Sequence, residues 1–244
     1  MISTNRPFDD RADAYDAYRT GYSRTLYETL LELGFTPGWH VLDVACGTAL
    51  ASEPLSQRGF RITGVDVSER MLEKARARIS QAEFVRGEAE ALPFERGEFD
   101  AAICAQAIHW MDKGKAVAEM ARVVRPGGRV AVWWKTLVPE EPIRLLRAAA
   151  AEAVGKTAPP DIMEGSFRAF YQHPFAERWL RVVPYVVMTT TDRWIGYEKS
   201  RARLEHYGER AQDYLVELER RMREIDRDKP FRVNYSQFLY VAQV

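Results

Sequence analysis

The apolar and polar positions in the first half of the chain follow two alternating patterns. Short continuous apolar runs, typical of strands buried on both faces, lie at 41–45, 60–65, 82–86, 99–106 and 128–135. Between them are segments with apolar residues at helical spacing, two of which begin at the capping residues Ser68 and Asp112. Strands that alternate with helices predict an α/β fold with a parallel sheet.

The pattern changes after residue 135. Residues 142–154 have helical spacing, 181–190 is typical of a strand, 192–228 holds two helical segments, and 231–244 returns to a strand pattern. The complete pattern predicts a Rossmann-like, seven-stranded, mostly parallel sheet with helices on both faces. The segment 192–228 is predicted to be a helical cap inserted near the C-terminus.

Two features suggest a ligand site at one edge of this sheet. The first strand ends in the small-residue turn Cys46-Gly47-Thr48-Ala49, and the second ends on Asp66. Ligands of open α/β sheets bind beyond the carboxyl ends of the strands, so the turn and Asp66 should face one crevice. Asp66 lies 19 residues after Gly47, close to the ~20 at which an acidic side chain binds adenosine ribose hydroxyls. The alternative is an ordinary surface aspartate.

The residues around this turn narrow the choice of ligand. A dinucleotide site needs three glycines so that the backbone can approach a pyrophosphate, whereas here Ala45 and Ala49 flank a single Gly47. Asp43 adds a carboxylate within the first strand, which would repel a pyrophosphate and suits a cation. S-adenosylmethionine combines adenosine with a positive charge and has no phosphate.

Composition excludes several other classes of protein. The 244 residues include 35 Lys and Arg against 35 Asp and Glu, so no overall field attracts nucleic acid or membrane. No apolar run reaches the ~18 residues of a spanning helix. Two cysteines exclude a disulfide framework, and the four scattered histidines give no metal-ligand spacing. We expect a cytoplasmic protein without a metal, as a monomer or homodimer.

Five segments, in the correct order over roughly residues 10–135, resemble the motifs of class I S-adenosylmethionine-dependent methyltransferases. They are Val41 to Ala49, Gly64 to Ser68 with Met71 and Leu72, Gly87 to Phe94, Phe99 to Gln106, and Arg125 to Gly128. The sequence departs from the family at Ala45 and Ala49, where glycine is usual. Their effect on cofactor affinity is left open.

The resemblance implies a set of cofactor-binding residues. They are Tyr15, Arg19, Asp43, Ala45, Cys46, Gly47, Asp66, Val67, Met71, Glu88, Ala89, Ala105 and Gln106. By resemblance, Tyr15 and Arg19 close over the carboxylate of the cofactor, while Glu88 and the Ala89 amide contact adenine. A solvated helix face is the alternative for Arg19.

The segment Ala105 to Trp110 most resembles the Ala-His-Trp variant of trans-aconitate methyltransferase-like enzymes. That resemblance implies that His109 is the catalytic residue, which either orients the acceptor or removes its proton. It also implies that Trp110 lines the acceptor pocket. Core packing is the alternative for Trp110.

A second group of acceptor-binding candidates lies in the predicted cap. Trp194, Tyr197 and Arg201 recur at spacings of three and four, so one helical face presents two aromatic rings and a guanidinium that could clamp a carboxylate. The alternative is a packed helix with Arg201 paired to a local glutamate. Residues 193–232 contain 11 basic and 9 acidic side chains, which does not indicate a nucleic-acid-binding arm.

These features predict a methyltransferase (EC 2.1.1) that acts on a small molecule, with a carboxylic acid favoured. A tRNA methyltransferase and a non-catalytic cofactor-binding subunit are the alternatives. We expect a single domain over 1–244. Within it, N-terminal lid helices occupy 1–36, the cofactor-binding core occupies 37–135, and substrate-cap segments occupy 155–180 and 192–228.

Overall fold

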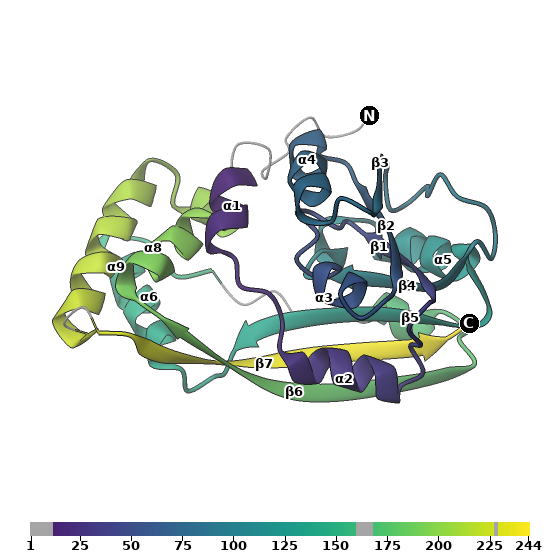
Figure 1. The fold of residues 1–244 in the computed structure, drawn as a ribbon. Coiled ribbons are helices and arrows are strands. Elements are labelled where there is room, and N and C mark those ends of the chain that lie inside the picture. The colour runs from purple at the N-terminus through teal and green to yellow at the C-terminus, as the bar shows by residue number, and fades with distance from the viewer. Residues whose placement is uncertain (1–11, 160–167, 227–228) are drawn as a thin grey trace. The chain divides into compact units, whose positions relative to one another are not determined.

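A seven-stranded sheet organises the fold (Figure 1). The computed structural model describes residues 12–159, 168–226 and 229–244. The strand order is β3-β2-β1-β4-β5-β7-β6, and every pairing from β3 to β5 is parallel. The strands are β1 His40–Val44, β2 Arg61–Asp66, β3 Glu83–Arg86, β4 Phe99–Ala105, β5 Val124–Leu137, β6 Glu177–Thr189 and β7 Phe231–Gln243. The predicted α/β class and mostly parallel seven-stranded sheet are confirmed.

Helices connect most of these strands. They are α1 Ala12–Tyr18, α2 Arg24–Glu32, α3 Glu53–Ser56, α4 Glu69–Arg78, η2 Ile108–Trp110, α5 Lys113–Val123, α6 Pro142–Ala153, α7 Arg168–Gln172, α8 Thr191–Lys199, η3 Ala202–Arg210 and α9 Ala211–Asp226. As predicted, Ser68 and Asp112 cap α4 and α5, each accepting a hydrogen bond from the amide three residues later. The helix that follows the first turn, α3, has only 4 residues.

The chain forms two compact units, each built from separate stretches of sequence. The helical unit comprises Met1–Thr20, Thr136–Asp161 and Pro184–Ser236, and the sheet unit comprises Gly21–Lys135, Ile162–Val183 and Gln237–Val244. Helices α1 and α2, both in the predicted lid region 1–36, therefore belong to different units. Strands β5, β6 and β7 contribute residues to both units.

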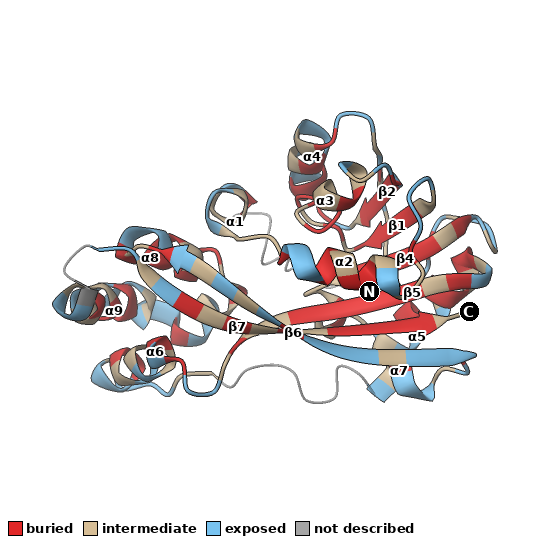
Figure 2. Ribbon diagram, turned by 60° about the horizontal axis from the view of Figure 1, so that its bottom comes forward, coloured by how far each residue is buried: buried red, intermediate tan, exposed pale blue. Residues whose placement is uncertain are grey.

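The core of the sheet unit lies on both faces of its central strands β1, β4 and β5, which are largely buried, whereas β6 is largely exposed (Figure 2). Because successive side chains of a strand point to opposite faces, neighbouring residues enter different clusters. Leu42 and Val132 pack with the apolar faces of α5 and α7, whereas Val41 and Trp133 pack with those of α2 and α3. Helices therefore cover both faces of these strands.

The described part of the predicted cap segment 155–180 contributes to this core. Phe170 is fully buried and lies 5.0 Å, centroid to centroid, from the ring of Phe175. Both rings belong to the cluster that contains α5, and residues 160–167 lie outside the described residues. A role for 155–180 in covering a substrate remains a prediction.

The helical unit has its own apolar core, to which Trp194, Tyr214 and Leu218 contribute. Helices α8 and α6 both pack on α9, and α1 packs on α8. Gly196 permits that last contact, because a Cβ atom at this position would lie 2.3 Å from the ring of Tyr18. Helices lie between β6 and β7 where the sequence predicts them, with residues 227–228 outside the described residues. Their function as a cap remains a prediction. None of the described helices is both long and apolar enough to span a membrane.

Candidate cofactor and acceptor site

The turn after β1 adopts a left-handed backbone at three positions. The φ angles are 54° at Ala45, 55° at Gly47 and 60° at Ala49. This conformation costs a residue with a Cβ atom roughly 1–2 kcal/mol, which explains why glycine suits both alanine positions. Among described residues other than glycine, only Gln106 shares a positive φ, at 58°. Residues with a left-handed backbone are found often at functional sites. Gln106 lies at such a place, because it directly follows β4.

Replacing Ala45 with glycine should raise the free energy of unfolding by up to about 1 kcal/mol. The variant removes left-handed strain, although the greater freedom of glycine in the unfolded chain offsets part of the gain. Urea denaturation measures the effect. Ala51→Gly is the matched control, because Ala51 is 5% exposed without a positive φ and its replacement should destabilise the protein. Equal destabilisation by both variants would show that the turn is unstrained.

Asp66 joins the turn to the start of α4. Its Oδ2 accepts a hydrogen bond from the Gly47 amide at 2.9 Å, and its Oδ1 accepts one from the Ser68 amide at 2.9 Å. The structure therefore brings Gly47 and Asp66 together, as the sequence predicts. A carboxylate offers about four lone-pair positions, so one that holds two amides can also bind the vicinal hydroxyls of a ribose.

Asp43 is 1% exposed at the level of the same turn. Its Oδ2 accepts a hydrogen bond from the Ser52 hydroxyl, while its Oδ1 has no partner among the described residues. Burial raises the pKa of Asp43 to about 7 and the charge of Asp66 adds to the rise, against the Ser52 hydrogen bond. A buried oxygen without a donor costs roughly 1–3 kcal/mol. A cationic ligand would supply the missing partner, so this carboxylate fits S-adenosylmethionine.

The remaining residues of the first two motifs differ in exposure. Cys46 and Met71 are 7% and 3% exposed, whereas Val67 is 42% exposed. Cys46 and Cys104 are both free, and burial raises the pKa of each thiol. A protonated, buried thiol is unreactive, so neither cysteine is placed as a nucleophile. Cofactor binding by Cys46, Val67 and Met71 remains a prediction. Within the described ranges, no three histidine, cysteine or acidic side chains are placed to hold a metal ion.

The turn after β3 lies beside the end of β2. The Gly87 amide donates to the Asp66 carbonyl at 3.0 Å, which brings the following Glu88 and Ala89 toward the ribose aspartate. Ala89 is 8% exposed and belongs to the core of the sheet unit, and Glu88 forms a bridge with Ala91. The predicted adenine contacts of Glu88 and Ala89 remain a prediction.

Gln106, the residue after β4, is hydrogen-bonded to β5. The Gln106 amide donates to the Trp133 carbonyl and the Gln106 Nε2 to the Lys135 carbonyl, both at 2.9 Å. Ala105 is the last residue of β4. The left-handed Gln106 therefore has its side chain held by the neighbouring strand. Its contact with the cofactor, like that of Ala105, remains a prediction.

His109 and Trp110 lie in the short helix η2, with ring centroids 5.0 Å apart. Trp110 is 51% exposed. That exposure excludes the alternative in which Trp110 packs in the core, and it leaves the indole available to a ligand. His109 is half-buried, and its predicted action on the acceptor remains a prediction.

Tyr15 and Arg19 lie in the helical unit. Arg19 Nε donates to the Ser200 hydroxyl at 3.0 Å, and its guanidinium lies 4.8 Å from the Tyr15 ring and 4.9 Å from the Tyr197 ring. Arg19 is thus held by α8 and by its own segment, in contrast to a solvated residue. The binding of cofactor by Tyr15 and Arg19 remains a prediction.

The three cap candidates are packed inside the same unit. Trp194 is 3% exposed, and its ring centroid lies 5.1 Å from that of Tyr197. Arg201 Nη1 contacts Glu198 Oε1 at 3.2 Å. The structure thus shows the arrangement stated as the alternative, a packed helix with Arg201 paired to a local glutamate. Spacing alone could not decide between a carboxylate clamp and this ion pair. Glu198 lies three residues before Arg201, so both side chains were expected on the same helical surface.

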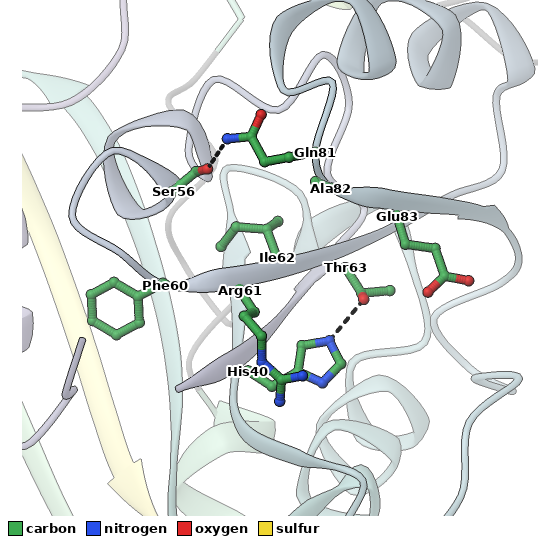
Figure 3. A pocket seen from close by; sticks show the side chains of 9 residues that line it. All are labelled: His40, Ser56, Phe60, Arg61, Ile62, Thr63, Gln81, Ala82 and Glu83. Carbon is green, nitrogen blue, oxygen red and sulfur yellow. Dashed lines mark hydrogen bonds between the residues drawn. The ribbon is translucent and has the colours of Figure 1, made fainter. Parts of the chain in front are cut away.

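A separate polar pocket of about 310 Å³ lies at the opposite edge of the sheet (Figure 3). It surrounds the first residues of β1, β2 and β3, whereas the turn follows β1 and Asp66 is the last residue of β2. Figure 3 shows His40 Nε2 hydrogen-bonded to Thr63 Oγ1 at 2.9 Å. The His40 ring also packs 4.6 Å from that of Phe99, which gives His40 a structural role.

Comparisons with known proteins agree with this geometry. Residues 42–132 match the family model described as a methyltransferase domain. A demethylmenaquinone methyltransferase of Renibacterium salmoninarum is 31% identical over 188 residues, covering 71% of this chain and 79% of that protein. An uncharacterized methyltransferase of Mycobacterium tuberculosis is 36% identical over 129 residues, which cover 53% of this chain and 52% of that protein. The chain thus spans about half the length of that relative.

Solved structures extend the likeness over most of the chain. A structure from Anaeromyxobacter dehalogenans, assigned as a type II methyltransferase, is 25% identical with a TM-score of 0.74, covering 93% of this chain and 98% of its own. The fold is also shared with phosphoethanolamine N-methyltransferase 2 of Haemonchus contortus, solved with S-adenosylmethionine. That structure is 18% identical, has a TM-score of 0.56, and is matched over 96% of this chain and 57% of its own.

The chain belongs to the class I S-adenosylmethionine-dependent methyltransferases. S-adenosylmethionine is accordingly its cofactor, and the unpartnered oxygen of Asp43 and the position of Asp66 fit that molecule. The narrower resemblance of residues 105–110 to trans-aconitate methyltransferase-like enzymes remains a prediction.

Proposed function

We propose that the protein transfers a methyl group from S-adenosylmethionine to a small-molecule acceptor, and that the acceptor is an organic acid. The observation that carries the proposal is the buried Asp43 oxygen without a partner beside the amide-holding Asp66. One carboxylate suits the positive charge of the cofactor, and the other suits its ribose.

The names of two relatives support a small-molecule methyl acceptor. Besides the demethylmenaquinone methyltransferase, a malonyl-[acyl-carrier protein] O-methyltransferase of Serratia marcescens is 35% identical over 123 residues, covering 50% of this chain and 48% of that protein. The second name describes methylation at oxygen of an acid derivative.

The residues of this chain act by binding and orientation. The cofactor supplies a methyl group already activated on sulfonium. Asp43 and Asp66 hold the molecule at two points, and Trp110 offers an exposed indole beside His109. The rate then depends on holding the acceptor close to the methyl carbon and on excluding water. An acid acceptor is already ionised, so His109 orients it, whereas a phenol or an amine would need His109 as a base.

Two other functions are less well supported. A tRNA methyltransferase would be expected to show a basic surface, and the chain has equal numbers of basic and acidic residues. A non-catalytic subunit would follow if Ala45 and Ala49 abolished cofactor binding, yet the turn already holds the left-handed backbone at both positions. The two buried free cysteines fit a reducing, cytoplasmic location.

The choice among acceptors can be tested with a panel of di- and tricarboxylic acids, phenols, amines and unmodified tRNA. Release of demethylated cofactor measures turnover. We expect turnover with acids, and we expect His109→Gln to retain it within about tenfold because an ionised acid needs no base. A base role would cost about 10²–10⁴-fold.

His173→Gln is the matched control for the histidine substitution, because His173 follows α7 and packs on Phe175 in the core of the sheet unit. It should leave turnover unchanged. Turnover with tRNA and none with any acid would end the organic-acid proposal. Tight cofactor binding without turnover on the whole panel would favour the non-catalytic alternative.

A further inference from the structure

The polar pocket at the edge of the sheet opposite the turn lies at a step between two strands. Strand β3 begins with Glu83 opposite Thr63, so Arg61 and Ile62 at the start of β2 extend past it. The hollow there has a volume of about 310 Å³, within the ~300–1,000 Å³ of small-molecule sites. All of its lining residues belong to the sheet unit, so the pocket lies within one unit.

The walls of this pocket are held by hydrogen bonds between separate segments of the chain. Gln81 Nε2 donates to the Ser56 hydroxyl at 2.9 Å, which joins the turn before β3 to the end of α3 (Figure 3). The hydrogen bond between His40 Nε2 and Thr63 Oγ1 joins β1 to β2. Thr63 is buried. These contacts form the pocket before any ligand arrives.

Two exposed side chains of opposite charge line the pocket. Neither Arg61 nor Glu83 has an ion pair or a side-chain hydrogen bond among the described residues. Burial and Arg61 lower the pKa of His40, against three nearby carboxylates that include Glu83. Both charges therefore act on the same imidazole ring, and His40 is mostly neutral at pH 7. The lining of the pocket then carries one positive and one negative charge.

The strand register sets the distance between these charges. Arg61 lies two residues before Thr63, whose partner in β3 is Glu83. With a rise of ~3.3 Å per residue and ~4.8 Å between strands, the Cα atoms of Arg61 and Glu83 are roughly 8 Å apart. Partnered residues, and residues two apart in a strand, share a face of the sheet. Both long side chains can therefore reach one small molecule.

The mixed charge of the pocket selects the class of ligand. A simple anion would be attracted by Arg61 and repelled by Glu83, and a simple cation would meet the reverse. A small zwitterion suits both, because its carboxylate accepts from a guanidinium and its ammonium group donates to a carboxylate. The apolar side chains of Phe60, Ile62 and Ala82 also line the pocket, and they suit an apolar substituent on that ligand.

We propose that this pocket binds a free α-amino acid with an apolar side chain. In this complex, Arg61 holds the carboxylate of the amino acid and Glu83 holds its ammonium group. The pocket lies at the edge of the sheet opposite Asp66, so the proposal goes beyond methyl transfer and its test needs no turnover. S-adenosylmethionine also carries an amino acid group, and the tests below separate the two binding places.

L-leucine tests the pocket by nuclear magnetic resonance. In the cofactor-saturated protein, we expect saturable chemical-shift changes at the amides of Arg61, Thr63 and Glu83, with those of Gly47 and Ser68 unchanged. Absence of leucine binding would overturn the proposal. Changes centred on Gly47 and Ser68, or leucine binding that saturating cofactor abolishes, would overturn it by placing the amino acid in the cofactor site.

Two analogues test the recognition of each charge. Leucinamide lacks the carboxylate of leucine, and 4-methylpentanoate lacks its ammonium group. Each should bind about fivefold more weakly than leucine, the usual size of effect for an ion pair that solvent can reach. Equal binding of all three compounds would contradict the proposal.

Substitutions of the two charged residues should change this selectivity in different ways. Arg61→Gln should bind leucinamide as well as leucine, because the carboxylate loses its partner. Glu83→Gln should bind 4-methylpentanoate as well as leucine. Both side chains are exposed, so both variants should fold. Arg96→Gln and Glu73→Gln are the matched controls, because Arg96 and Glu73 are exposed and lie outside the pocket.

The control variants should retain the wild-type Kd for leucine and the wild-type selectivity. Unchanged selectivity in both pocket variants would contradict the roles given to Arg61 and Glu83. An equal loss of leucine affinity in pocket and control variants would also overturn the proposal, because it would show a general effect of surface charge.

Discussion

Asp66→Ala should bind S-adenosylmethionine about 100-fold more weakly than the wild-type protein. The substitution removes two charge-assisted hydrogen bonds to the ribose, each worth ~1.5–3 kcal/mol, and the lower value for both corresponds to about 100-fold in Kd. It also removes the acceptor of the Gly47 and Ser68 amides, so the turn should lose order. Isothermal titration calorimetry with the cofactor and its demethylated product measures the loss.

Asp100→Ala is the matched control for Asp66→Ala. Asp100 lies near the start of β4, where its carboxylate accepts from the His40 amide at 2.8 Å and from Arg125 Nε at 2.7 Å. Its loss should lower the melting temperature without changing the cofactor Kd. Wild-type affinity in Asp66→Ala would show that Asp66 holds only the backbone. A loss of affinity in both variants would indicate a general effect of destabilisation.

Cofactor affinity should fall about tenfold per pH unit below pH 7 and stay nearly constant above it. The pKa of Asp43 in the free protein is raised to about 7, mainly by burial, so below that pH most molecules hold a neutral carboxyl group. A cationic ligand binds the ionised form, and the proton must therefore leave before binding. Titrations at pH 5.5, 6.5 and 7.5 check the slope, and Asp43→Asn should abolish it.

The same pKa shift should affect the stability of the protein without cofactor. The pKa of Asp43 in the folded protein is raised above its usual 3.8, so the protonated carboxyl group stabilises the folded state. This stabilisation is fully present below pH 3.8. The contribution is lost as the pH rises toward 7. Asp43→Asn lacks this loss, so its unfolding free energy relative to wild type should increase between pH 4 and pH 7.5, by on the order of 4 kcal/mol. A constant difference across that range would contradict the raised pKa.

The strands and helices of the sheet unit could be predicted because each is marked by an apolar pattern or a capping residue within its own segment. The apolar run 41–45 is buried on both faces as β1, and the caps Ser68 and Asp112 start α4 and α5. The fifth strand was predicted to begin at residue 128, whereas β5 begins at Val124. There the register with β4 shifts, so that Phe99 pairs with Val124 and Ala101 with Arg129. A bulge of this kind depends on the partner strand, which a local pattern cannot show.

The details of the candidate site depend on contacts between distant residues. Position relative to the strands predicted that Asp66 would meet the turn at Gly47, and the structure confirms it. The Ser52 hydroxyl on Asp43 was not predicted, since it comes from an irregular segment with no periodic signal. The pairing of Arg147 with Glu198 joins residues 51 positions apart, which no sequence spacing can indicate.

The division of the N-terminal segment between two units could not be predicted from the sequence either. Helices α1 and α2 are separated by a few residues, and nothing in their composition shows that one packs on α8 and the other on the sheet. Packing of α1 depends on a single small residue of a distant helix, Gly196. Such a contact becomes visible only when both partners are placed.

The close approach of Gly196 to the Tyr18 ring links the side chains that the two positions can hold. Because a Cβ atom at position 196 would overlap the Tyr18 ring, any side chain gained at 196 requires a smaller residue at 18. The two positions should therefore change together among homologues, although they lie 178 positions apart in this chain. A lineage that lost the glycine would also lose the close approach of α1 to α8. The N-terminal segment of that lineage would then be released to diverge on its own.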